Sequence, residues 1–238
     1  MAMDPRKRQK KLEKQRAKKK AAKRAIARRQ AQGFAAQFET AANSPILHCC
    51  MREELWDKGI GEVLISRSLP NGNVAFAVFL VDVYCLGVKD AWSGIPSRLE
   101  YDETLYGKIR RQSEIVSVKP AYARKLIEGA VQYAEAIGLS PHADYRVAKL
   151  IFGEISTDSC TEQFVYGHDG KPFFISGPYD DAYRCRHIMK TMESHCGPDG
   201  YHYLLSVDDP TSSSIAQIDG EFNDGLIGPD EDEFYYKE

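Results

Sequence analysis

The segment from Asp82 to Asp90 holds the residue types in this chain that are most suited to chemistry. Asp82, Cys85, Lys89 and Asp90 follow an apolar run that we expect to form a strand. Two carboxylates after a central strand can hold a Mg²⁺ ion in a hydrolase or nuclease site. Cys85 would be a nucleophile if a base such as His142 lay beside it.

A structural role explains the same residues. A carboxylate at a strand end, here Asp82, can accept backbone N–H hydrogen bonds, and Cys85 can serve as a small core residue. If Asp82 is buried it needs a partner, which Lys89 or Arg67 can supply. We therefore assign no catalytic residue and no cofactor. We would expect a bound Mg²⁺ ion only under the alternative hypothesis, in which Asp82 and Asp90 form a metal site.

Two further groups of polar residues have spacings that a turn or a helix explains. Asp169-Gly170 is typical of a hairpin turn, although Lys171, near Asp180-Asp181, could line a pocket. Cys185 and His187 lie two residues apart on an expected helix and so face different sides. No pair of cysteines or histidines has the spacing of a zinc site, and we expect no structural metal.

A basic arm at residues 1–32 is the strongest functional signal. Residues 1–30 contain 14 Lys and Arg against two acids, a net charge of +12. The candidate nucleic-acid-binding residues are Arg6, Lys7, Arg8, Lys10, Lys11, Lys14, Arg16, Lys18, Lys19, Lys20, Lys23, Arg24, Arg28 and Arg29. Helix propensity is high here, but like charges one turn apart oppose the helix. We expect the arm to become helical against an anionic partner.

The arm fits a phosphate backbone, where affinity comes from the release of counterions. RNA or the ribosome is the expected partner, and DNA or an anionic membrane surface would satisfy the same charge. The arm cannot read sequence alone, because phosphate contacts position a protein and base contacts specify. An idle solvated tail, or a latch onto the chain's own acidic end, is the alternative.

Residues 208–238 form an acidic tail of net charge −9, and residues 31–207 carry −5. We expect the tail to be disordered, and in one alternative it is a protein-interaction segment that mimics nucleic acid. The six cysteines include no C-x-x-C pair, and the N-terminus has no apolar run of a signal peptide. These features predict a cytoplasmic protein with free thiols and without a transmembrane segment.

Residues 33–207 are expected to form one domain. Helices are predicted over 46–58, 102–111, 120–137, 140–152 and 179–195, and strands over 62–68, 73–83, 164–166, 172–176 and 201–207. Pro70-Asn71-Gly72 is typical of the turn between the first two strands. The strand at 73–83 is apolar on both faces, which predicts a central position with cover on both sides. Phe34 and Phe38, one helical turn apart, predict where the arm docks.

Three segments carry a resemblance to a known family. They are Val81–Asp90, Ala134–His142 and Tyr166–Pro178. Together they resemble an uncharacterised bacterial family with a VD-x-x-CLGVKD strand motif and a GxDGKPxxxxGP hairpin. The resemblance spans roughly residues 46–207 and implies a shared domain without a known activity.

The sequence therefore predicts an α+β domain with an antiparallel or mixed sheet. Its central apolar hairpin would be covered by helices on both faces. The leading functional hypothesis is a non-catalytic RNA- or ribosome-associated protein. The alternatives are a metal-dependent hydrolase or nuclease centred on Asp82 and Asp90, and an interaction module that uses the acidic tail.

Overall fold

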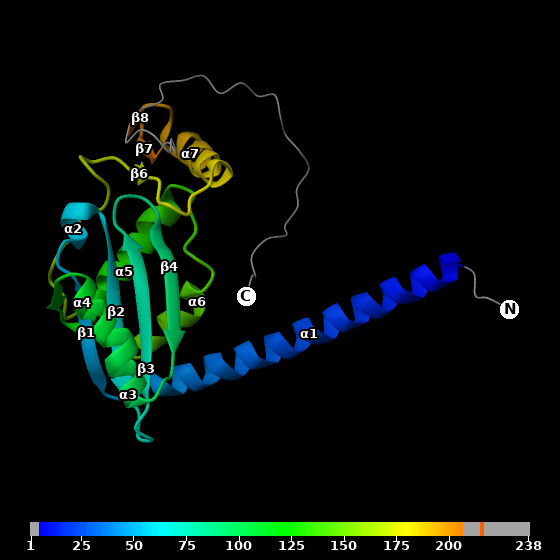
Figure 1. The fold of residues 1–238 in the computed structure, drawn as a ribbon. Coiled ribbons are helices and arrows are strands. Elements are labelled where there is room, and N and C mark those ends of the chain that lie inside the picture. The colour runs from blue at the N-terminus through cyan, green and yellow to red at the C-terminus, as the bar shows by residue number, and fades with distance from the viewer. Residues whose placement is uncertain (1–4, 207–214, 217–238) are drawn as a thin grey trace.

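The computed structural model describes residues 5–206 and 215–216, and Figure 1 shows the arrangement of the elements. The helix α1 (Pro5–Ala41) leaves the body at one end of the main sheet and extends away from it. Its 37 residues span about 55 Å at the rise of an α-helix. The arm is thus helical, and the helix continues through residue 32 without a break.

The main sheet has five antiparallel strands in the order β4-β3-β2-β1-β5. The strands are β1 (Ile46–Arg52), β2 (Ile60–Ser68), β3 (Val74–Asp82), β4 (Gly87–Gly94) and β5 (Ile115–Ser117). The predicted hairpin is confirmed, since β2 and β3 pair along their whole length. Ser68 pairs with Val74 next to the turn, and Ile60 pairs with Asp82 at the far end. Gly72 closes the turn at a φ of +81°, in the left-handed region that favours glycine.

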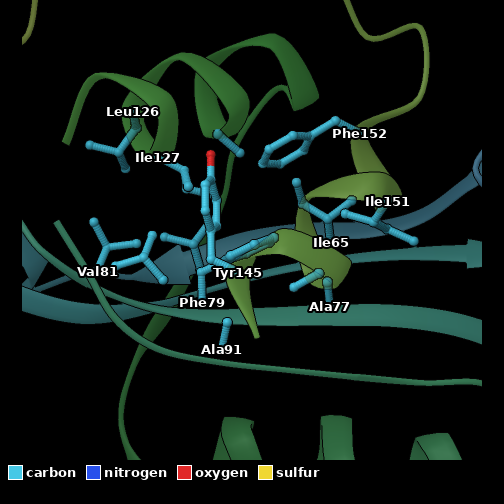
Figure 2. Close-up of a cluster of buried hydrophobic side chains, with 14 of the residues drawn as sticks. Ile65, Ala77, Phe79, Val81, Ala91, Leu126, Ile127, Tyr145, Ile151 and Phe152 are labelled. Atoms are coloured by element: carbon cyan, nitrogen blue, oxygen red, sulfur yellow. The ribbon is translucent and has the colours of Figure 1, made fainter. Parts of the chain in front are cut away.

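The larger apolar core lies between one face of the sheet and the helices that cover this face. On this side lie α5 (Pro120–Ala136), α6 (Tyr145–Ala148) and the 3₁₀ helix η2 (Lys149–Phe152). Figure 2 shows Tyr145 between α5 and the sheet, above Phe79. The Phe79 ring stacks on that of Phe152 at 5.4 Å between centroids. This face buries alternate residues of β3, as expected for a strand.

Shorter helical segments cover the opposite face. They are α3 (Arg98–Glu100), the π-helix η1 (Tyr101–Tyr106) and α4 (Gly107–Gln112). Tyr101 and Ile109 pack there against Val74 and Val78 of β3. Since β3 is buried on both faces, the predicted α+β fold with a helix-covered antiparallel sheet is confirmed.

A smaller sheet and one helix lie at the end of the main sheet opposite the base of α1 (Figure 1). The sheet has the order β6-β7-β8, from Phe173–Ile175, His202–Ser206 and Ile215–Ala216. The helix α7 (Ala182–Cys196) buries Cys185, Ile188, Met189 and Met192 in a separate apolar cluster. The rest of the acidic tail lies outside the described residues.

The predicted helix at 46–58 is wrong over most of its length. Residues 46–52 form β1, and only α2 (Leu55–Lys58) is helical. Cys49, Cys50 and Met51 are buried in succession, because β1 is covered on both faces. A short apolar run of this kind does not distinguish a strand from a helix by periodicity.

Two other boundaries also differ from the prediction. The helix expected from Ser140 begins at Tyr145, because residues 139–144 form a loop in which the His142 amide donates to the Val88 carbonyl of β4. The hairpin expected at 164–176 has its turn, through the His168–Lys171 bridge, but residues 164–166 form no strand. Instead β6 pairs in parallel with β7, and the Tyr166 hydroxyl donates to the Leu126 carbonyl of α5.

Candidate functional site

Asp82 ends β3 and holds together the turn into β4. Its Oδ1 accepts hydrogen bonds from the backbone amides of Tyr84 and Cys85, both at 2.9 Å, and from Leu86 at 3.3 Å. Burial raises the pKa of this carboxyl to about 6, against the opposing effect of the three amides. Asp82 thus has the surroundings of a structural carboxylate that organises a turn.

Asp90 has different surroundings from Asp82. It pairs across the ladder with Leu80, whereas Asp82 pairs with Gly87. Its side chain is 53 % exposed, with Oδ1 at 3.6 Å from Nδ1 of His142. Among the described residues, no group of three or more His, Cys, Asp or Glu side chains gathers to hold a metal ion. The structure therefore gives the two carboxylates separate partners.

Cys85 is fully buried in the apolar cluster that also contains Phe174 and Met192 of α7. Burial raises the pKa of its thiol well above the ordinary value, and the Asp82 charge adds to the shift. A nucleophilic cysteine needs the opposite, a lowered pKa or an adjacent base. The proposed base, His142, contacts Asp90 and Asp144 instead. These surroundings suit a core residue.

Lys89 forms an ion pair that the sequence did not indicate. Its Nζ lies 2.6 Å from Oδ2 of Asp180, whose side chain is only 2 % exposed. Asp180 also accepts from the Gly177 amide at 2.7 Å and pairs with Arg184 at 3.0 Å. Burial works to raise the pKa of Asp180, but the Lys89 hydrogen bond, the amide and the two cations outweigh it and lower that pKa. Lys171, expected near Asp180, donates to the Asp199 carbonyl instead.

The segments that carry the family resemblance meet in one place. The Gly167 amide donates to the Val83 carbonyl at 2.9 Å, and the Phe173 amide donates to the Tyr84 carbonyl at 3.2 Å. The Tyr84 ring also packs edge-on against His168 at 5.1 Å. The motif residues therefore join the smaller sheet and α7 to the end of the main sheet, with Lys89–Asp180 as the charged contact.

At two glycines of these segments, a neighbouring element comes so close that it leaves no room for a side chain. Gly87 has a φ of +67°, and a Cβ there would lie 2.9 Å from the Ala130 carbonyl of α5. Gly138, at a φ of +81°, lies against the ring of His195, with 2.3 Å between an added Cβ and the nearest ring atom. Side chains at either position would push apart elements that the motifs hold together.

Arg67, the other cation considered for Asp82, has a different role. It is buried and donates to the carbonyls of Ile151, Phe152 and Ser44, at 2.9, 2.9 and 2.6 Å. Ser44 follows the end of α1, so this guanidinium fastens the base of the arm to the body. Phe38 of the same helix is fully buried in the main core and stacks on Phe34 at 5.5 Å, which confirms the predicted docking point.

The arm itself is solvent-exposed over the part whose side chains the structure describes. Residues 16–24 are all exposed, and they comprise six cations and three alanines. Arg16, Lys19, Lys20, Lys23 and Arg24 recur at intervals of three and four, which places them on one side of the helix. Of the other arm cations, Lys18 is exposed on the opposite side, and the side chains of Arg6, Lys7, Arg8, Lys10, Lys11, Lys14, Arg28 and Arg29 lie outside those described.

A buried polar network was missed at the sequence level. The Tyr101 hydroxyl lies 2.8 Å from Ser66 Oγ and 2.9 Å from His48 Nδ1, and the His48 ring stacks on Tyr106 at 4.0 Å. Burial is the main cause that lowers the pKa of His48, and the charge of Arg98 adds to it. No local signal could have found this network, because it depends on the pairing of β1 with β2 and on the π-helix η1.

Comparisons of the chain with protein-family models, with curated proteins and with solved structures found no match. The resemblance based on the three motif segments therefore stays a prediction. Among the described residues, no helix is both long and apolar enough to cross a lipid bilayer.

Proposed function

We propose that this protein binds RNA through α1 and that the folded body is the non-catalytic platform from which this helix extends. The observation that carries the proposal is the exposed segment 16–24, which presents six cations and no acid. The body and the tail are acidic, so the positive charge of the chain is concentrated on this helix.

The helix presents these charges at a useful spacing. Residues 16–24 span about 12 Å along the axis, and five of their six cations share one side. Ala17, Ala21 and Ala22 add little bulk, so the helix can approach a nucleic-acid backbone closely. Neutralised phosphates release counterions, which supplies most of such sequence-independent affinity.

An RNA partner fits the composition better than a membrane does. Amphipathic helices that lie in a membrane carry large apolar side chains on one face. Between Leu12 and Ile26 the only nonpolar residues of the arm are alanines. The six cysteines are free, which suits a reducing compartment where structured RNA is abundant. We accordingly propose a cytoplasmic location, with the ribosome as one candidate RNA.

The contacts of the motif residues support the non-catalytic part of the proposal. Asp82 organises a turn, Cys85 is a core thiol and Lys89 pairs with Asp180. Each has a structural partner, and none is left to activate a nucleophile. No observation favours the hydrolase centred on Asp82 and Asp90 over this explanation.

Charge-neutral variants test the proposal. In the arm variant, Arg16, Lys18, Lys19, Lys20, Lys23 and Arg24 become Gln, which keeps helix propensity high. In the control variant, six exposed body cations become Gln, namely Arg111, Arg146, Lys58, Lys108, Lys119 and Lys149. Both variants lose six charges, four from Lys and two from Arg, so they are matched in the number and type of charge removed.

Binding is measured by fluorescence anisotropy with a labelled RNA duplex at low salt. We expect the arm variant to lose at least about tenfold in affinity, since it neutralises fewer phosphates, and the control to lose much less. Equal losses would show that only net charge matters, and the proposal would fail. Duplex DNA and anionic vesicles are tested in parallel, and a preference for either one over RNA would replace the proposed partner.

A further inference from the structure

Two aromatic side chains at the start of α7 are unusually exposed. Tyr179, just before the helix, is 94 % exposed, and Tyr183, in its first turn, is 75 % exposed. Exposing tyrosine rings to this degree forgoes the burial that stabilises most aromatic residues. The other aromatic rings of the body pack against neighbours in many pairs, as Tyr84 does against Phe173 at 6.0 Å.

The helix geometry places two cations on the same side as the Tyr183 ring. The buried face of α7 consists of Cys185, Ile188, Met189 and Met192. Tyr183, Arg186 and Lys190 recur at intervals of three and four, so they share the side that points away from this buried face. We name Tyr179, Tyr183, Arg186 and Lys190 the α7 platform.

Three acids lie near the platform. The Asp180 side chain is buried and engaged by Lys89 and Arg184. Asp181 caps α7, where its Oδ1 accepts from the Arg184 amide at 2.8 Å. Glu193, three residues beyond Lys190, is a neighbour of that lysine along the helix. The side of α7 that carries Tyr183 thus combines two cations, Arg186 and Lys190, with this one acid, on a body whose net charge is negative.

We propose that the α7 platform binds single-stranded RNA, with bases stacked on Tyr179 and Tyr183 and the backbone held by Arg186 and Lys190. Exposed aromatic rings beside cations are how proteins hold unpaired bases, because every base offers a π-face. A duplex keeps its bases stacked inside and offers the rings no partner. The inference rests on the proposed RNA-binding function and adds a second contact, at the opposite end of the body from the base of α1 (Figure 1).

The test compares a labelled single-stranded oligouridylate with an RNA duplex of equal length, using the full chain. The platform variant is Tyr179→Ser with Tyr183→Ser. The ring-preserving variant is Tyr179→Phe with Tyr183→Phe. The matched control is Leu99→Ser with Val165→Ser, which removes two other large exposed side chains, 67 % and 79 % exposed. None of these side chains is in the core, so all four proteins should fold.

We expect the Ser pair to weaken single-strand binding by about tenfold or more and to leave duplex binding unchanged, because each stacked base contributes appreciably to affinity. The Phe pair and the control should bind as the unaltered chain does. The proposal is overturned if the Ser pair binds the single strand normally, or loses both RNAs equally. It is also overturned if the only effect of the Ser pair is a change of oligomeric state in sedimentation, which would mark a protein–protein surface.

The arm variant separates this inference from the proposed function. If it loses duplex binding while the Ser pair has no effect on either RNA, the function stands and the platform fails. If it binds both RNAs normally but the Ser pair loses the single strand, the platform stands and the role of the arm fails. If the unaltered chain binds neither RNA at low salt, both proposals fail.

Discussion

At the scale of single residues, the motif around Asp82 shows how a candidate active site can be a structural junction. A buried carboxylate, a cysteine and a lysine within eight residues suggest chemistry when only the sequence is considered. Each of them has a structural partner in the fold: three backbone amides, an apolar cluster and Asp180. The ion pair of Lys89 joins residues 91 positions apart, so no local pattern could have predicted it.

The pH dependence of stability tests the role given to Asp82. Its pKa in the folded chain is about 6, above the ordinary value of 3.8, so the folded state holds this proton more tightly than the unfolded state. The protonated Asp82 carboxyl therefore adds to the unfolding free energy in full below about pH 4, and this stabilisation is lost as the pH rises through about 6. The shift corresponds to about 3 kcal/mol of unfolding free energy over this window.

Asp82→Asn keeps a carbonyl oxygen for the amides of residues 84–86 but cannot ionise. We expect its unfolding free energy, from urea titrations at several pH values, to lack this decline, so that the difference between the two proteins changes by about 2 kcal/mol between about pH 4 and pH 7. Other groups, such as His48, titrate in both proteins and cancel in the difference. Parallel pH profiles would contradict a buried, amide-bound Asp82.

At the scale of elements, α1 combines two regions with different roles. Its last turns are part of the core through Phe38, and residues 16–24 contact solvent. We expect deletion of residues 1–32 to leave the unfolding free energy of the body nearly unchanged. Phe38→Ala in the full chain should lower it by about 3–5 kcal/mol, the cost of emptying a buried Phe site.

Urea unfolding followed by circular dichroism provides both values, and the glutamine arm variant serves as a control that keeps the helix. If the deletion costs as much as Phe38→Ala, the exposed part of α1 supports the body. The division of this helix into an anchor and an exposed binding segment would then be wrong.

The elements that were predicted well have strong local signals. The hairpin of β2 and β3 has a Pro-Asn-Gly turn between two apolar strands, and α5 begins at Pro120 and precedes Gly138. The elements that were missed depend on distant partners. The strand β1 is defined by its pairing with β2 and β5, and β6 by its parallel pairing with β7, about 30 residues further along the chain.

At the scale of the whole molecule, charge is separated along the chain. The N-terminal 30 residues carry +12, the middle −5 and the last 31 residues −9. The sequence alone located this basic segment and its docking phenylalanines. It could not reveal that the helix that carries the cations at residues 16–24 stands away from the body, or that Tyr179 and Tyr183 remain uncovered.

The salt dependence of RNA binding tests whether the cations of α1 hold the phosphates. The slope of the logarithm of the binding constant against the logarithm of salt concentration reports the number of phosphates that a protein neutralises. The full chain, the glutamine arm variant and the six-residue body control are titrated between about 50 and 200 mM salt with one RNA duplex.

We expect a steep slope for the full chain and the body control. For the arm variant we expect a slope that is shallower by about one unit for each phosphate that this variant no longer neutralises. Three identical slopes would contradict RNA binding through α1, because the phosphates would then be held by some surface other than residues 16–24.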